Sequence, residues 1–186
     1  LQIATGEATD WRAGNIAIRV GDSATATGGD IEVIGGRSTR RSGVGGSVLV
    51  RSGAADRLNG RSGDLAIETA NGGSFGSSGT LAVTTGSASE DGHTGAVVIA
   101  TGNAEGGQAG SMRILVGSSG SGDGADFVLA AGHSAEATGG ALQLVSGEGD
   151  LGSGNVHLGS PSSASRGAST GDVVVGSGDS ILGQVG

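Results

Sequence analysis

Three histidines are the side chains of this sequence best suited to move protons or to bind a metal ion near neutral pH. His93, His133 and His157 fall at three different positions of three different repeats in the repeating pattern set out below. A shared site would need them in one column, so we predict that they are turn or outward-facing residues. The sequence therefore predicts no catalytic residue and no metal site at the histidines.

Glycine and aspartate are concentrated in the stretch 120–126, which is similar to the calcium loops of nonapeptide-repeat proteins. Those loops place Asp in a fixed column, whereas the Asp residues just before an apolar segment lie in scattered repeats here. These residues are Asp30, Asp64, Asp126 and Asp172. Calcium needs about six to eight converging oxygen ligands. We therefore predict no specific calcium site, and no cofactor.

All ten basic residues are Arg, against 18 acidic residues, and the net charge is −8. Six arginines cluster in the third and fourth repeats: Arg37, Arg40, Arg41, Arg51, Arg57 and Arg61. This cluster is either a contact for self-association or for an anionic glycan, or a set of solvated turn residues. The acidic balance predicts that nucleic acids and anionic membranes are not partners. No apolar run is long enough to predict a membrane span.

The aromatic residues and the threonines bear on two further functions, polysaccharide cleavage and ice binding. Polysaccharide-cleaving enzymes on parallel β-helices line a groove with aromatic residues, but Trp11, Phe75 and Phe127 are far apart here. We therefore predict that the protein is not an enzyme. Ice-binding solenoids present flat ladders of Thr, and Thr69, Thr85 and Thr101 recur at one repeat position. That position shares its parity with apolar residues and should point inward, which makes ice binding a secondary hypothesis.

The whole chain is organised by one repeated phrase, clearest in the stretch 81–88. Its first six residues, here called the apolar segment, have apolar residues at positions 1 and 3, a mostly small or hydroxyl residue at position 5 and Gly at position 6. The segments start at Leu1, Ile16, Ile31, Val48, Leu65, Leu81, Val97, Met112, Phe127, Leu142, Val156 and Val173, at intervals of 14 to 17 residues. Position 6 is Gly in ten copies, with Ala70 and Pro161 as exceptions.

This pattern predicts an all-β fold. Alternation at positions 1, 3 and 5 is the period of a strand with one buried face. Glycine at position 6, and a second glycine cluster before the next segment, indicate corners where a side chain would clash or φ must be positive. Between them we expect a weaker second strand. Stacked repeats would then form a single-stranded parallel β-solenoid of about twelve coils over residues 1–186, with a thin core.

A bundle of polyproline II helices is the competing fold, but it predicts glycine at every third residue. The solenoid has its own energetic requirement. A coil's two apolar anchors contribute about 3–6 kcal/mol, whereas ordering the backbone of each residue costs roughly 1–2 kcal/mol. An isolated coil should therefore be unstructured.

The phrase Gly79–Ser87, set in Gly-Ser-Ala coils, resembles the low-complexity repeats of large algal and oomycete surface proteins. This resemblance implies cell-surface or filament material without catalytic residues. We therefore expect a structural protein, a rigid rod or filament subunit at the cell surface or in the extracellular matrix. Its copies would associate end to end or laterally into fibres, as a segment of a longer rod or by stacking, with glycans as further candidate partners. The alternative is an ice-binding or glycan-binding module that uses one flat face.

Overall fold

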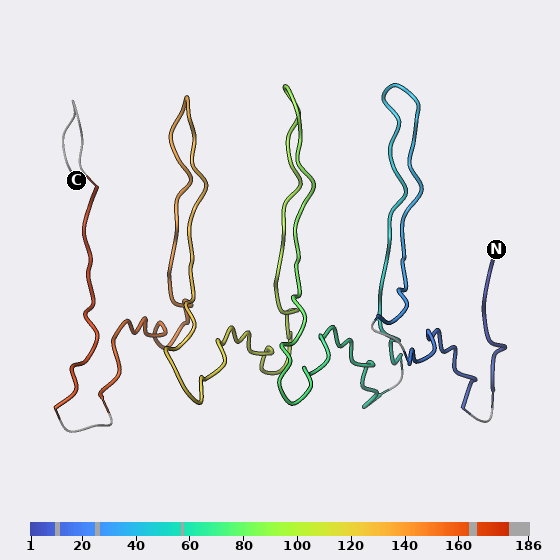
Figure 1. Cartoon of the computed structure of the whole chain (residues 1–186), viewed down its shortest axis with the longest axis horizontal. Helices are drawn as coiled ribbons and strands as arrows, with labels where there is room; N and C mark the ends of the chain where they lie inside the picture. Colours follow the sequence, from blue (N-terminus) through green and yellow to red (C-terminus); the bar gives the residue numbers. More distant parts are fainter. Residues whose placement is uncertain (10–11, 25–26, 57, 164–166, 179–186) are drawn as a thin grey trace. The chain divides into compact units, whose positions relative to one another are not determined.

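The computed structural model describes residues 1–9, 12–24, 27–56, 58–163 and 167–178. None of these residues lies in a helix or a β-strand, and Figure 1 accordingly draws extended segments joined by loops. The predicted β-solenoid of twelve coils is therefore wrong, and so is the β-helix description. The second strand expected within each repeat is also missing from the described residues.

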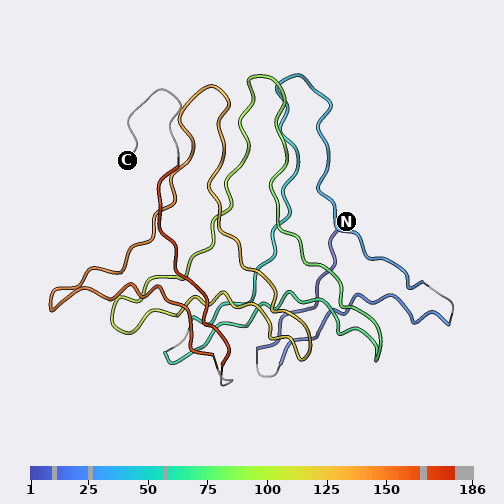
Figure 2. The same ribbon diagram turned by 60° about the vertical axis from the view of Figure 1, so that its left-hand side comes forward.

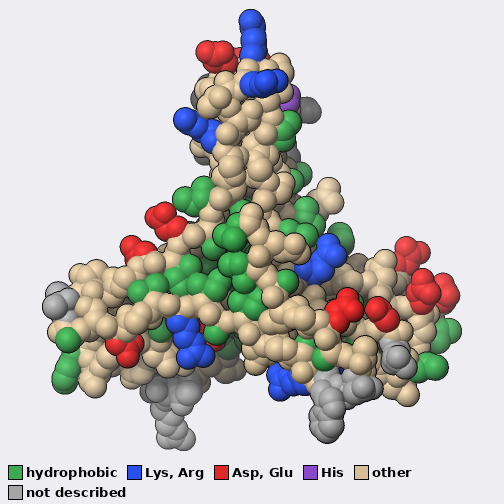
Figure 3. Space-filling view, turned by 90° about the vertical axis from the view of Figure 1, so that its right-hand side faces the viewer, with side chains coloured by type: hydrophobic (Ala, Val, Ile, Leu, Met, Phe, Trp, Pro, Cys, Tyr) green, Lys and Arg blue, Asp and Glu red, His purple; other side chains and the backbone are tan. Residues whose placement is uncertain are grey.

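The described part of the chain has no buried core. No hydrophobic residue is buried, and hydrophobic side chains lie open at the surface in Figure 3. The accessible surface is 19206 Å². A compact monomer of this 17.5 kDa mass would expose about 7,900 Å², and its unfolded chain about 25,400 Å². One copy of the chain thus leaves exposed most of the surface that a folded protein buries.

The repeat nevertheless has a regular conformation. Apart from Leu1, the side chains at position 1 are all 48% to 57% exposed, from Met112 at the lower end to Leu81 and Val173 at the upper. The least exposed residues include Gly35, Ser52 and Ser146, all at position 5. Each apolar segment therefore turns the same edge toward its own loop, and that edge stays half open.

The contacts divide the chain into two units, Leu1–Val97 and Val98–Gly186. The boundary lies within the apolar segment that starts at Val97, so the repeat continues through both units. The prediction of one repeat domain over residues 1–186 stays a prediction.

A backbone hydrogen bond closes several of the loops between apolar segments. In the first unit the amide of Gly46 donates to the carbonyl of Gly36 (2.7 Å), and Gly63 donates to Gly53 (2.9 Å). In the second unit Gly140 donates to Gly132 and Gly154 to Gly147, both at 2.9 Å. The acceptor is always position 6, and the donor always lies two residues before the next apolar segment. The repeat is therefore an extended segment followed by a closed loop.

The donor position of these bonds is here called the closing position. It is glycine in ten of eleven loops, with Ala125 as the exception: Gly14, Gly29, Gly46, Gly63, Gly79, Gly95, Gly110, Gly140, Gly154 and Gly171. A Cβ atom at Gly29 would lie 2.7 Å from Val20 Cγ1, and one at Gly46 would lie 3.0 Å from the amide nitrogen of Gly36. At Gly46 glycine is needed because two backbones approach closely there, whereas at Gly29 the close atom belongs to a side chain.

The chain reverses at the loop tips and not at the predicted glycine corners. Ser42, Asn59 and Glu90 have positive φ values of 62°, 62° and 54°. Gly43 donates to the Arg40 carbonyl (3.0 Å) and Gly92 to the Ser89 carbonyl (3.2 Å), and each bond closes a tight turn. Large apolar residues also lie at the loop tips, where Phe75 and Leu151 are fully exposed. Trp11 lies outside the described residues.

Candidate functional site

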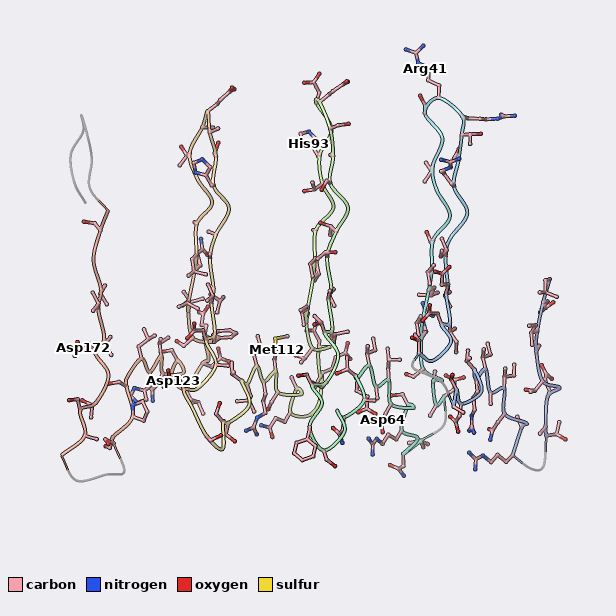
Figure 4. The ribbon with its side chains drawn as sticks, viewed as in Figure 1. Arg41, Asp64, His93, Met112, Asp123 and Asp172 are labelled. Atoms are coloured by element: carbon pink, nitrogen blue, oxygen red, sulfur yellow. The ribbon has the colours of Figure 1, made fainter. Side chains whose placement is uncertain are left out.

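The three histidines are exposed and lie in separate repeats. His93 lies near the outer end of the loop 86–95, as Figure 4 shows. His133 directly follows the loop-closing acceptor Gly132, and the His157 ring lies next to Gly159. No group of three or more His, Cys, Asp or Glu side chains that would suit a metal ion occurs among the described residues.

The Gly-Asp stretch 120–126 forms a bend in which Gly122 has φ of 83°. The Ser119 hydroxyl donates to the backbone carbonyl of Asp123 at 2.9 Å. That carbonyl therefore accepts a hydrogen bond within its own turn. The absence of a specific calcium site stays a prediction.

The arginine cluster does not form one continuous site. Arg37, Arg40 and Arg41 lie on the loop 36–46, with Arg41 at its outer end in Figure 4. Arg61 makes an ion pair with Asp64 at 2.9 Å in another loop, where both side chains are more than 80% exposed. Arg57 lies outside the described residues. Arg51 is also exposed, but it lies in an apolar segment, apart from the three arginines grouped on the loop 36–46.

Two of the three threonines that recur at position 5 lie against their own loops. A Cβ atom at Gly79 would lie 3.8 Å from Thr69 Cγ2, and one at Gly95 would lie 3.8 Å from Thr85 Cγ2. The methyl groups of these two threonines therefore face the closing glycines. Thr101 makes no such approach, since a Cβ atom at Gly110 would meet nothing within 4 Å.

Two features that repeat along the chain are the strongest candidates for a functional surface. The first is the exposed apolar edge formed by positions 1 and 3, such as Leu81 and Val83. The second is the column of glycines at position 6. The sequence pattern singled out both features, but it predicted the apolar edge in the core of one chain and the glycines at the corners of that chain. The structure leaves them open, and no cavity lies among the described residues.

No known protein family matches the sequence, and neither does any curated protein or solved structure. Within the part that the structure describes, no helix has the length and hydropathy required to cross a lipid bilayer.

Proposed function

We propose that the protein is a non-catalytic structural subunit that becomes ordered by associating with further copies of itself into a rod or filament. The observation that carries this proposal is the exposure of every large apolar side chain at positions 1 and 3 of the described repeats. Such a surface exceeds by far what soluble monomers expose in one patch. It is the behaviour of a chain whose core forms only in an assembly.

The exposed area sets how much surface must be covered when copies associate. The chain exposes roughly 11,000 Å² more than a compact monomer of its mass. Stable interfaces bury about 1,200–2,000 Å² in total, and obligate ones about 2,000–5,000 Å² or more. A single contact patch on an unrelated globular partner is too small to cover this surface. A partner that follows the chain along its length is required.

A second copy of the chain meets that requirement best. The apolar pairs recur at intervals of 14 to 17 residues, and those intervals are uneven. A partner must match this uneven spacing over many repeats, and an identical chain does so in register.

Location at the cell surface or in the extracellular matrix is part of the same proposal. It is supported by the resemblance of the Gly-Ser-Ala repeats to surface proteins. Glycan binding through Arg37, Arg40 and Arg41 stays a prediction, as does ice binding, for which the structure offers no flat ladder of described threonines.

Sedimentation velocity and far-ultraviolet circular dichroism over a range of concentrations test the proposal. We expect multimers with an ordered spectrum at micromolar protein, and loss of order as dilution releases single chains. Ordered monomers of 17.5 kDa with a cooperative thermal transition would contradict it. So would chains that stay monomeric and disordered at every concentration.

A further inference from the structure

The glycines at position 6 have no explanation within one copy of the chain. A Cβ atom built on any of the ten would meet nothing within 4 Å, and none has φ in the left-handed region. The ten are Gly6, Gly21, Gly36, Gly53, Gly86, Gly102, Gly117, Gly132, Gly147 and Gly178. Glycine is selected where φ is positive or where another backbone comes close. The first reason does not apply. Glycines elsewhere, such as Gly106, are equally open, so it is the regular recurrence of glycine at position 6 that points to a backbone outside this copy.

The backbone at position 6 is held in place where that approach would occur. The carbonyls of Gly36, Gly53, Gly132 and Gly147 accept the loop-closing hydrogen bonds. The open space therefore lies beside a fixed segment of backbone. Most backbone groups of the apolar segments also lack a backbone partner among the described residues, since only eight backbone–backbone bonds join those residues. Folded proteins form about one hydrogen bond per residue.

The directions of the loops indicate how many copies fit. In the first unit the loops 36–46 and 86–95 extend to the same side, and Arg41 and His93 mark their outer parts in Figure 4. The two intervening loops, 53–63 and 70–79, leave in two other directions (Figure 2). Between the loops 36–46 and 86–95 the chain therefore sends no loop to this side, and the two places that it passes over are here called levels.

We propose that three copies of this chain wind around one another, each filling with its loops the levels that the other two leave vacant. The glycines at position 6 then lie against the backbone of the neighbouring copy. This inference rests on the proposed function, because it specifies the number of copies and their contact. Closed cyclic symmetry is the common arrangement of identical subunits. Two copies would leave one level in three empty, and a fourth copy would find no vacant level.

The arrangement also accounts for the open backbone groups. Neighbouring extended chains that exchange hydrogen bonds lie about 4.8 Å apart. Loops of one copy on the same side would then lie about 14.4 Å apart, with two loops of the other copies between them. The apolar side chains at positions 1 and 3 of one copy would be covered by those of the next.

Native mass spectrometry of the full chain tests the number of copies. We expect a species of about 52.5 kDa, three times the 17.5 kDa chain, or larger species in steps of that mass. Assemblies that grow in steps of one, two or four chains would overturn the three-copy inference while the proposed self-association stands. Monomers alone would overturn both.

The glycine contact is tested by a Gly86→Val substitution and its control, Gly106→Val. Gly106 also has open space around it and no positive φ, but it lies outside position 6 and the closing position. We expect Gly86→Val to raise the concentration at half dissociation at least about tenfold, because each copy inserts extra side chains into a close contact. Gly106→Val should change it less than about twofold.

A Gly86→Ala variant is measured in parallel, since it reports a shift even where valine abolishes assembly. Equal effects of the substitutions at Gly86 and Gly106 would overturn the contact. An unchanged dissociation concentration for both Gly86 variants would overturn it as well.

Discussion

The two glycine columns of the repeat differ in what surrounds them. At the closing position, Gly29 and Gly46 lie so close to their own loop that a Cβ atom would clash at 2.7 Å and 3.0 Å. At position 6, ten glycines border open space. Both columns recur with the same regularity in the sequence. The contacts of one copy therefore account for glycine at Gly29 and Gly46 in the first column, and they account for no glycine of the second.

This difference separates two levels of organisation in one repeat. The closing glycines serve the loop, whose geometry is complete in a single chain. The position 6 glycines serve contacts that a single chain does not make. The loop that begins at Pro161 has no glycine at position 6, and there the Ser160 hydroxyl donates to the carbonyl of the closing residue Gly171 at 2.6 Å.

The largest effect is expected when alanine replaces the position 6 glycine in two loops, in comparison with alanine at the closing position of the same two loops. Gly53→Ala with Gly86→Ala alters position 6, and Gly63→Ala with Gly95→Ala alters the closing position. At Gly63 and Gly95 the nearest atoms to a new Cβ lie at 3.6 Å and 3.8 Å, an ordinary contact. We expect the first pair to destabilise the assembly by about 1–3 kcal/mol per site and the second by less than about 1 kcal/mol.

Thermal unfolding followed at several protein concentrations measures both variants. The first pair should lower the midpoint most at low concentration, since it weakens association. If the closing pair proves the more damaging, the assignment of the two columns to different contacts is wrong.

A smaller effect is expected within the closing column itself. Gly46→Ala places a Cβ atom 3.0 Å from the amide nitrogen of Gly36, while at the adjacent Gly45 the nearest atom, the Gly36 carbonyl oxygen, is 3.6 Å away. Backbone cannot yield as a flexible side chain does, so Gly46→Ala should open the loop 36–46. We expect faster amide hydrogen exchange over residues 36–46 for Gly46→Ala and wild-type exchange for the control Gly45→Ala. Equal exchange in the two variants would contradict this.

The sequence predicted the repeat and its extended segments but not what covers them. The alternation of apolar residues, as at Ile16 and Ile18, shows that one edge of the segment must be covered. The same alternation is expected whether the next repeat or another copy of the chain covers that edge. The solenoid prediction chose the next repeat, and the open side chains show otherwise. Position 6 glycine was likewise assigned to a corner, although the reversals occur at residues such as Ser42 and Asn59.

The prediction of no catalytic residue and no metal site rests on residue spacing alone, and it stays a prediction. His93, His133 and His157 lie in three separate repeats of the structure. The closing position was not predicted as a separate column, because its glycine lies among other glycines before the next apolar segment. Comparing the residue two places before each apolar segment would have found it, since ten of eleven loops carry glycine at that place.

A Cβ atom at Gly29 should be tolerated better when the Val20 side chain that it meets is shortened. The atom nearest a Cβ at Gly29 is Val20 Cγ1, at the end of a side chain, so Val20→Ala makes room for it. We expect Gly29→Ala to be less destabilising in a Val20→Ala background, with a coupling energy of about 0.5–3 kcal/mol. A double-mutant cycle by thermal unfolding measures this, and strictly additive effects would mean that the two residues do not meet.

The smallest effect is expected from the ion pair beside a closing glycine. Arg61 and Asp64 flank Gly63, and their side chains are 83% and 84% exposed. Exposed pairs contribute about 0–1 kcal/mol because water and salt screen them. Asp64→Asn should therefore shift the unfolding midpoint only slightly, and the shift should vanish at high salt. A large loss of stability that salt does not change would contradict this. It would mean that the Arg61 and Asp64 side chains stabilise the loop 53–63 more than the closing bond from Gly63 to Gly53, which involves neither side chain.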